Sequence, residues 1–191
     1  MNGYQDTLYA HSNRQYYRQG TIQGTIDFIF ADASAVFQAC KIIVRKPLEN
    51  QVCTVTAQGR KNLTSKGALV LQGCTITAEP GYMATDPMPN PTLAAHGKST
   101  QRTIIMQSFI NINIVPEGWL SWAGTFGLDT CYFGEFDNNG PGANTGRRVR
   151  WNGIKKISPQ KAYGYTPGRY IQGDLWIKAT GVPYDSGMMV S

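Results

Sequence analysis

The stretch FQACKI, residues 37–42, decides the fold of this chain because closely similar stretches return further along the sequence. These are LQGCTI at residues 71–76 and, for the first half only, MQSF at residues 106–109. The glutamine that they share recurs at intervals of 34 and 35 residues. Short β-type segments that recur at a coarse period are typical of a solenoid, whose stacked coils place equivalent residues about 4.8 Å apart. We therefore expect an all-β parallel β-helix; the alternative is a β-sandwich with coincidental glutamine spacing.

The repeated glutamines are Gln38, Gln72 and Gln107, and Gln19 is a candidate fourth member. Further β-type segments lie around them and are interrupted by glycine and proline. The C-terminal tail carries aromatic residues among turns, so we expect it to pack across the side of the solenoid, with a short helix near Pro159–Ala162. The expected β segments cover residues 14–30, 35–44, 52–58, 68–77 and 103–110.

The heptapeptide GTIDFIF, residues 24–30, is an apolar β-type run with one carboxylate at its centre. Strand alternation would place Asp27 and Ile29 on one face and Phe28 on the other. Aspartate is uncommon in strands because its side chain competes with the backbone for hydrogen bonds. The sequence therefore indicates either a structural hydrogen-bond acceptor or a reactive acid at Asp27.

Asp6 lies 21 residues before Asp27, which is close to one coil of a parallel β-helix. Stacking would then bring the two carboxylates together, and two close acids cannot both ionise freely. One could donate a proton while the other attacks a carbonyl carbon. Gln5, beside Asp6, offers an amide donor to an oxyanion. The alternative is that Gln5-Asp6-Thr7 is only a polar turn.

The chain is basic, with 18 lysine and arginine residues against 12 aspartate and glutamate residues and a formal net charge of +6. Such a charge favours an acidic partner, whether nucleic acid, acidic lipid or polyuronate. The basic residues are scattered apart from Arg147-Arg148-Val149-Arg150, so no nucleic-acid partner is indicated. No apolar run approaches the roughly 18 residues that span a bilayer, so no membrane partner is expected.

The length of 191 residues suffices for one well-packed domain, so we expect a single domain over residues 1–191. The first residues are polar and run directly into a patterned segment, which predicts no signal peptide in this chain. The four cysteines form no C-x-x-C pair, so no metal site is expected. Their even number permits disulfides without requiring them.

These motifs resemble those of plant pectin methylesterases (pectinesterases), in order and over nearly the whole chain. The resemblance is to the C-terminal part of the catalytic domain. It implies a right-handed parallel β-helix that is N-terminally truncated, because the upstream coils are missing. It also implies hydrolysis of galacturonate methyl esters in pectin, with release of methanol and no metal or other cofactor. The matching motifs are GYQDTLY (3–9), HSNRQ (11–15), GTIDFIF (24–30), VTAQGR (55–60), MQS (106–108), GW (118–119), GEF (134–136), NGPGA (139–143) and ATGVP (179–183).

The resemblance assigns roles by motif position. Asp27 resembles the nucleophile that attacks the ester carbonyl, and Asp6 resembles the acid that protonates departing methanol and then activates water. Gln5 resembles the hydrogen-bond donor to the tetrahedral oxyanion. Trp119 and Trp122 are candidates for stacking on sugar rings, and packing within the solenoid is the alternative.

The resemblance also implies a setting. Plant pectinesterases are secreted to the cell wall, or apoplast, where they act in cell wall modification and pectin catabolism. The implied polymer partner is partly methylated homogalacturonan, and a proteinaceous pectinesterase inhibitor is a candidate protein partner. A β-helical lyase or polygalacturonase is the weaker enzymatic alternative, because the acidic clusters of those enzymes are not evident in this sequence.

Four positions depart from the family pattern. Gly20 stands where plant members have a cysteine, which would pair with the position of Cys40. Ala31 stands where a glycine is usual. Ala95 stands where the family has the arginine that pairs with the nucleophile, and Gly97 stands where it has a tryptophan of the sugar groove.

The missing arginine predicts little esterase activity for the chain as written, because Asp27 loses its charged hydrogen-bonding partner. The alternative function is therefore a catalytically impaired, pectin-binding pseudoenzyme or fragment. Residues 94–101 also read as the family motif translated one base out of frame, which suggests a compensated frameshift that ends near Arg102. Resequencing the transcript tests this hypothesis, since an intact frame encoding Ala95 would rule out a sequencing artefact.

Overall fold

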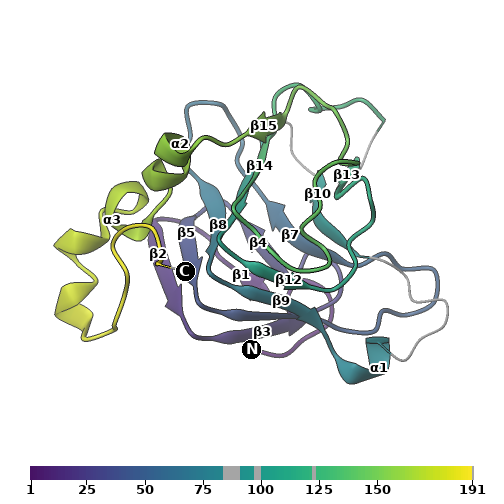
Figure 1. Cartoon of the computed structure of the whole chain (residues 1–191), viewed down its shortest axis with the longest axis horizontal. Helices are drawn as coiled ribbons and strands as arrows, with labels where there is room; N and C mark the ends of the chain where they lie inside the picture. Colours follow the sequence, from purple (N-terminus) through teal and green to yellow (C-terminus); the bar gives the residue numbers. More distant parts are fainter. Residues whose placement is uncertain (84–90, 97–99, 122–123, 191) are drawn as a thin grey trace.

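The computed structural model describes residues 1–83, 91–96, 100–121 and 124–190 of the chain (Figure 1). Every strand pair within these ranges that belongs to a sheet is parallel, and successive coils add strands to the same three sheets. The fold is a right-handed parallel β-helix. The prediction of an all-β solenoid is thereby confirmed over the sandwich alternative.

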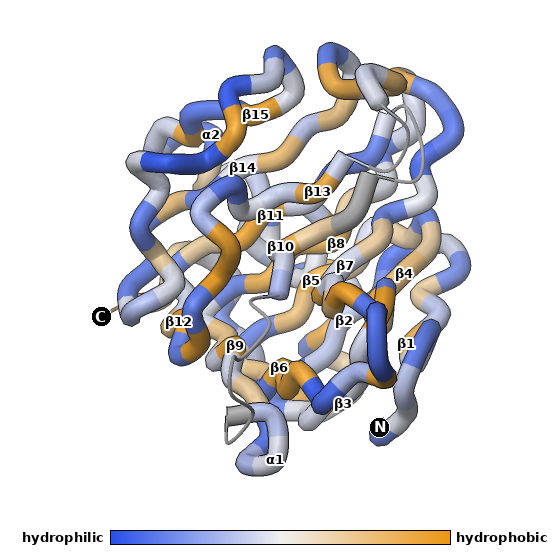
Figure 2. The backbone as a smooth tube through the Cα atoms, turned by 90° about the vertical axis from the view of Figure 1, so that its right-hand side faces the viewer, coloured by the Kyte–Doolittle hydropathy of each residue, from blue (hydrophilic) through white to orange (hydrophobic). Residues whose placement is uncertain are grey.

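The three sheets follow one another around each coil, and Figure 2 shows the strands of the first sheet stacked in order. The first sheet contains β1 (Leu8–Tyr9), β4 (Ile29–Ala31), β7 (Thr54–Gln58), β10 (Thr92–His96) and β13 (Trp119–Ser121). The second contains β2 (Arg14–Arg18), β5 (Ser34–Gln38), β8 (Ala68–Gln72), β11 (Arg102–Met106), β14 (Tyr132–Phe136) and β15 (Ile154–Lys156). The third contains β3 (Thr21–Gly24), β6 (Lys41–Val44), β9 (Thr75–Ala78) and β12 (Phe109–Asn111).

The strand register confirms part of the glutamine repeat and corrects the rest. Gln38 pairs with Gln72 across β5 and β8, as their 34-residue spacing predicts. Met106, rather than Gln107, pairs with Gln72, so the 35-residue interval is one residue out of register. Gln107 instead occupies the left-handed turn position after the strand, with φ 51°. Gln19 occupies the same kind of turn position, with φ 52°, so it is not a member of the in-strand ladder.

Both faces of the central strands β5, β8 and β11 of the second sheet are buried, which explains why these strands read as largely apolar runs. Phe37 and Leu71 belong to the main core inside the solenoid. Val36 and Val70 belong to a second cluster on the opposite face, which Ile171 of the C-terminal tail helps to cover. Full burial of each such side chain contributes about 1.5–3 kcal/mol, so the tail is an integral part of this fold.

The tail covers the side of the solenoid, as predicted, and Figure 1 shows its helices on the flank formed by β2 and β5. A helix is present where the sequence predicts one. Ser158 caps it, because the Ser158 hydroxyl oxygen accepts the backbone N–H of Lys161 at 3.3 Å. The helical segments are α2 (Pro159–Gly164), α3 (Pro167–Tyr170) and the 3-10 turns η1 (Gly173–Leu175) and η2 (Lys178–Thr180), with α1 (Pro80–Met83) elsewhere after β9.

Three glutamine side chains on successive coils hold the end of the tail. Gln38 donates to the carbonyl of Asp185 and accepts its N–H, both at 2.9 Å. Gln107 does the same with Met189, at 2.9 and 3.0 Å. Gln72, between them, donates to the tail carbonyl of residue 187 at 3.0 Å. This glutamine clamp binds the tail across the coils through backbone groups.

The four cysteines are free and buried. Gly20 lies beside Cys40 on the neighbouring coil, because the N–H of Lys41 donates to the Gly20 carbonyl at 2.9 Å. A Cβ atom added at Gly20 would meet nothing within 4 Å. The register therefore places the position of the missing cysteine opposite Cys40, while the glycine leaves that thiol without a disulfide partner.

Candidate active site

Asp27 lies in a turn between two sheets rather than in a strand. β3 ends at Gly24 and β4 begins at Ile29, so the expectation of a continuous strand over residues 24–30 is wrong. The backbone of Asp27 is left-handed, with φ 50°, a conformation that aspartate tolerates better than most residues. Strand alternation therefore fails across the turn, and Phe28 and Ile29 are both completely buried.

Asp6 occupies the equivalent position on the preceding coil. Leu8 pairs with Ile29, so the coil at this point is 21 residues long, as the spacing of the two aspartates predicts. The N–H of Asp6 donates to the carbonyl of Ile26 at 3.1 Å, and Asp6 has a left-handed φ of 53°. The structure thus brings the two carboxylates to matching turns on adjacent coils.

Thr54 holds the carboxylate of Asp27 and was not singled out from the sequence. Its hydroxyl donates to Oδ1 of Asp27 at 2.5 Å and accepts the backbone N–H of Asp27 at 2.7 Å. The next coil is 27 residues long at this point, because Ile29 pairs with Thr56. A 21-residue spacing therefore does not lead to Thr54, and the sequence carries no signal for it.

Burial raises the pKa of the Asp27 carboxyl above its ordinary value. The hydrogen bond from Thr54 opposes this by stabilising the anion, and the negative charge of Asp6 adds to the rise. Asp6 and Gln5 are both exposed, whereas Asp27 is half-buried. The site therefore contains one sheltered acid, with an exposed acid and an exposed amide on the adjacent turn.

Aromatic side chains line the outer face of the first sheet beside these turns. The rings of Tyr9 and Phe30 stack, with centroids 4.9 Å apart and planes inclined by 18°. The ring of His11 follows at 5.0 Å from Tyr9. These residues line a cavity of about 460 Å³, which also reaches Asp32 and Lys61. Flat rings beside hydroxyl and charged groups are suited to binding a sugar.

Comparison with known proteins decides the family. The pectinesterase family model matches residues 1–174. This chain belongs to the pectinesterase family. A relative from Arabidopsis thaliana, whose name joins pectinesterase and pectinesterase inhibitor, is 54% identical over 188 residues, covering 98% of this chain and 26% of that protein. The pectinesterase of Petunia integrifolia is 49% identical over 192 residues, covering 99% of this chain and 51% of that protein.

A solved pectinesterase has the same fold. The pectin methylesterase from carrot superimposes with a TM-score of 0.95 at 43% identity, over 97% of this chain and 59% of the carrot chain. The chain thus spans between about a quarter and about a half of the curated relatives named above. A match this complete over the described ranges means that the coils present here are arranged as in the larger pectinesterase.

Ala95, to which the resemblance assigns the position of the family arginine, lies on β10. Ala94 pairs with Thr56, which pairs with Ile29, and Ala95 follows Ala94 and pairs with Leu120. Ala95 is therefore on the sheet that carries the turn of Asp27, two coils away. An alanine offers no hydrogen-bond donor there, and among the described residues no cation forms an ion pair with Asp27. Gly97 lies outside the described residues.

Of the two tryptophans considered for sugar binding, Trp119 is buried. Only 2% of its surface is exposed, and its ring stacks on Phe133 with centroids 4.7 Å apart. This arrangement favours the packing alternative for Trp119, because the ring is enclosed in the core. Trp122 lies outside the described residues.

The described part of the chain has neither a cluster of metal-ligating side chains nor a membrane-spanning helix. No group of three or more histidine, cysteine, aspartate or glutamate side chains there could hold a metal ion. No helix there has the length and apolar character needed to cross a bilayer.

Proposed function

We propose that this chain carries the carboxylate pair of a pectinesterase and that the pair hydrolyses methyl esters of galacturonate in pectin, releasing methanol. The observation that carries this proposal is the register of β1 and β4, which sets Asp6 and Asp27 on matching turns. Family membership supports the reaction class, since pectinesterases are carboxylic ester hydrolases.

In the proposed reaction Asp27 acts as the nucleophile. Its ionised oxygen attacks the ester carbonyl carbon, and the amide of Gln5 donates to the oxyanion that forms. Collapse of this intermediate breaks the bond to the methoxy oxygen, and Asp6 in its protonated form gives its proton to the leaving methoxide, which departs as methanol. Asp6, now ionised, takes a proton from water, whose oxygen attacks the acyl carbon. Asp27 leaves as a carboxylate, and the polymer keeps a new carboxylic acid, which ionises by releasing its proton to solvent.

The hydrogen bond from Thr54 supports the assignment of Asp27 as the attacking group. A nucleophilic carboxylate must be ionised and oriented, whereas burial favours its neutral form. The Thr54 hydroxyl offsets part of that effect and fixes one oxygen. A guanidinium would do both more strongly, so Ala95 lowers the activity that we expect of this chain.

A second candidate function is pectin binding without efficient turnover, and Ala95 is the observation that favours it. Both functions need the same cavity wall of Tyr9 and Phe30. The test is methanol release from highly methylated pectin by the chain and by its Asp27→Asn variant. Release that Asp27→Asn abolishes supports the esterase. Retained binding to pectin with no release in either protein supports the pseudoenzyme.

The setting is likewise proposed. The relatives' names indicate pectin as the substrate, and we propose that this chain meets pectin in the plant cell wall after secretion. Names that join pectinesterase and pectinesterase inhibitor support an inhibitor protein as a partner of this site. Addition of a purified plant pectinesterase inhibitor to the methanol assay tests that partner, because a bound inhibitor would lower the release.

A further inference from the structure

We propose that four cations between the solenoid and its C-terminal helices form a second anion site, and that it takes a carboxylate of de-esterified galacturonate. The four are Arg14, Lys66, Arg102 and Arg169, and we call them the basic pocket. The identity of the ligand rests on the proposed function; the presence of an anion site does not.

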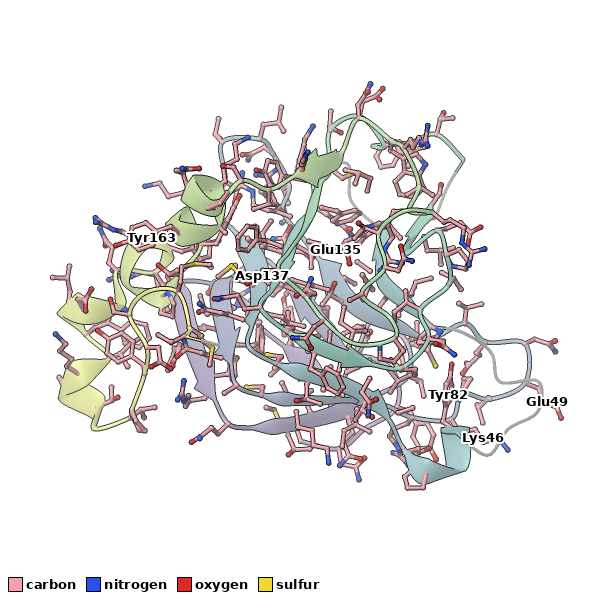
Figure 3. All side chains as sticks on the ribbon, viewed as in Figure 1. Lys46, Glu49, Tyr82, Glu135, Asp137 and Tyr163 are labelled. Carbon is pink, nitrogen blue, oxygen red and sulfur yellow. The ribbon has the colours of Figure 1, made fainter. Side chains whose placement is uncertain are left out.

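The basic pocket is a cavity of about 400 Å³, within the size range of small-molecule sites. Arg14 comes from β2, Arg102 from β11 and Arg169 from α3, while Lys66 precedes β8. It therefore lies where the tail helices meet the second sheet, at the flank where Figure 3 labels Tyr163 on α2. Ser34, Gly164, Tyr170 and Gln172 complete its lining.

No carboxylate among the described residues lines the basic pocket, although Asp32 lines the adjoining cavity and the charge of Asp174 acts on Arg169. Within the described ranges, no carboxylate forms an ion pair with any of the four. Arg102 has its Nε atom buried without a hydrogen-bond partner there, and its guanidinium lies 5.5 Å from the ring centre of Tyr132. Like charges around one cavity raise its positive potential, and a bound anion would relieve that repulsion.

A fifth cation lies close behind the pocket. Arg60 is 1% exposed and donates to the carbonyl of Thr100. Burial, followed by the charge of Arg102, lowers the pKa of the Arg60 guanidinium. The charge of Arg102 is therefore felt at Arg60, and the charge of Asp32 opposes it there.

Contacts across the chain position the side chains of Arg14 and Arg169 and the backbone of Lys66, all three of which are exposed residues. Arg14 donates to the side-chain oxygen of Gln172 at 2.7 Å and to the carbonyl of Ile171 at 3.4 Å. The guanidinium of Arg169 lies 5.2 Å from the ring centre of Tyr163. The hydroxyl of Tyr170 donates to the carbonyl of Lys66. Preorganised cations lose less side-chain entropy when an anion binds.

The adjoining cavities indicate which anion the pocket takes. A cavity of about 630 Å³ shares Arg14, Ser34 and Lys66 with the basic pocket, and it shares Asp32 with the cavity beside Tyr9. The three cavities therefore adjoin one another through shared lining residues, which gives a polymer in the cavity beside Tyr9 a route toward the basic pocket. Each hydrolysed ester leaves one carboxylate on that polymer. The de-esterified stretch is therefore negatively charged, which complements the positive charge of the basic pocket.

The test measures binding of trigalacturonate, which carries no ester and needs no turnover, by titration calorimetry on the whole chain. We expect Arg102→Gln and Arg169→Gln each to weaken binding at least tenfold, and the fully methylated trimer to bind at least tenfold more weakly. Arg147→Gln, an exposed arginine outside the pocket, should leave binding within twofold. Thermal unfolding of each variant checks that it is folded. Because Arg169 is exposed, Arg169→Gln still tests the proposal if Arg102→Gln misfolds.

Three outcomes overturn the proposal. Equal weakening by Arg147→Gln means that net charge alone attracts the trimer. Equal binding of the methylated trimer means that no carboxylate is recognised. Inorganic phosphate that competes as well as trigalacturonate means that the pocket takes any small anion. If trigalacturonate binds with these variant effects but the chain releases no methanol, the proposed anion site stands. Only the proposed esterase function is then refuted.

Discussion

Thr54 and Asp27 are joined by two hydrogen bonds, one in each direction. The hydroxyl of Thr54 donates to the carboxylate at 2.5 Å, and the same oxygen accepts the backbone N–H of Asp27 at 2.7 Å. The threonine therefore sets both the left-handed turn and the direction in which the carboxylate points. This relationship crosses from one coil to the next, so the nucleophile that we propose depends on a residue 27 positions away.

Replacing Thr54 with valine should raise the pKa of Asp27 further, because the hydroxyl that lowers it is lost while burial remains. The unpaired N–H and carboxylate should also cost about 1–3 kcal/mol of unfolding free energy. NMR titration of the Asp27 side chain measures the first effect and urea unfolding the second. Thr92→Val, one coil further along the same ladder, is the matched control, and an equal pKa shift there would contradict a specific role for Thr54.

The raised pKa of Asp27 predicts a pH-dependent stability. The folded protein holds the proton of the Asp27 carboxyl more tightly than the unfolded chain does. At a pH between the unfolded and folded pKa values of Asp27, the folded protein therefore binds more protons. The free energy of unfolding should therefore fall as pH rises from about 4, the unfolded value, through the folded pKa. Asp27→Asn removes this contribution, and its stability relative to the unchanged chain should rise across that window.

Asp137 supplies the control for that experiment. It is also an aspartate in a left-handed turn, with φ 52°, but it is exposed (Figure 3). Asp137→Asn should show no such rise in urea unfolding between pH 3.5 and 7. A parallel trend in the two variants would mean that the turn itself, rather than the buried carboxyl, sets the pH dependence.

Ala95→Arg should lower the pKa of Asp27, because a guanidinium on β10 favours the ionised carboxylate. Methanol release should then rise at least tenfold over that of the unchanged chain at neutral pH. Ala95→Gln has similar length without the charge and should do neither. Equal effects of arginine and glutamine at this position would argue against a charge-based role.

The buried pair of Glu135 and Arg148 should be costly to break. Arg148 donates to both carboxylate oxygens, at 2.8 and 3.1 Å, and also to the carbonyl of Gly142 at 2.7 Å; Figure 3 labels Glu135. Both side chains are less than a tenth exposed. Glu135→Gln leaves a buried cation unpaired and should cost about 3–5 kcal/mol in urea unfolding. Lys178→Gln, at an exposed pair of 3.7 Å, should leave the free energy of unfolding nearly unchanged.

Gln72→Leu should loosen the end of the tail. It removes the donor to the tail carbonyl and the side-chain hydrogen bonds that Gln72 makes with Gln38 and Gln107, at a cost of about 1–3 kcal/mol. Hydrogen exchange at residues 187–190 should accelerate more than exchange within β8. Gln160→Leu, on the exposed face of α2, should change neither. Unchanged exchange of the tail in Gln72→Leu would mean that packing alone holds it.

The sequence predicts the fold well because the repeat sits on strands. The residues of 37–42 and 71–76 are in register, and a ladder of identical side chains survives in the pattern even when loops differ in length. Gln107 shows the limit of this reasoning. It lies one residue out of register, yet its side chain still accepts a hydrogen bond from Gln72 at 3.2 Å, so a contact can mimic a repeat.

The candidate site is less predictable, for a physical reason. The coils that carry the site differ in length, with 21 residues between Leu8 and Ile29 but 27 between Ile29 and Thr56. A 21-residue spacing therefore relates Asp6 to Asp27 but does not lead from Asp27 to Thr54. The left-handed φ of Asp27 is also invisible to strand alternation, which therefore misplaces Ile29. The roles of Asp27, Asp6 and Gln5 stay predictions until activity is measured.

The glutamine clamp has a consequence for how this protein unfolds. In an ordinary solenoid each coil touches only its neighbours, so the ends can fray while the middle stays folded. Here one strip of backbone, residues 185–189, is bonded to three coils at once. When any of these coils unfolds, it loses its hydrogen bonds to the strip, and the strip is then held less firmly against the remaining coils. The strip therefore couples coils that do not touch one another. The clamp therefore turns a one-dimensional stack into a more cooperative unit.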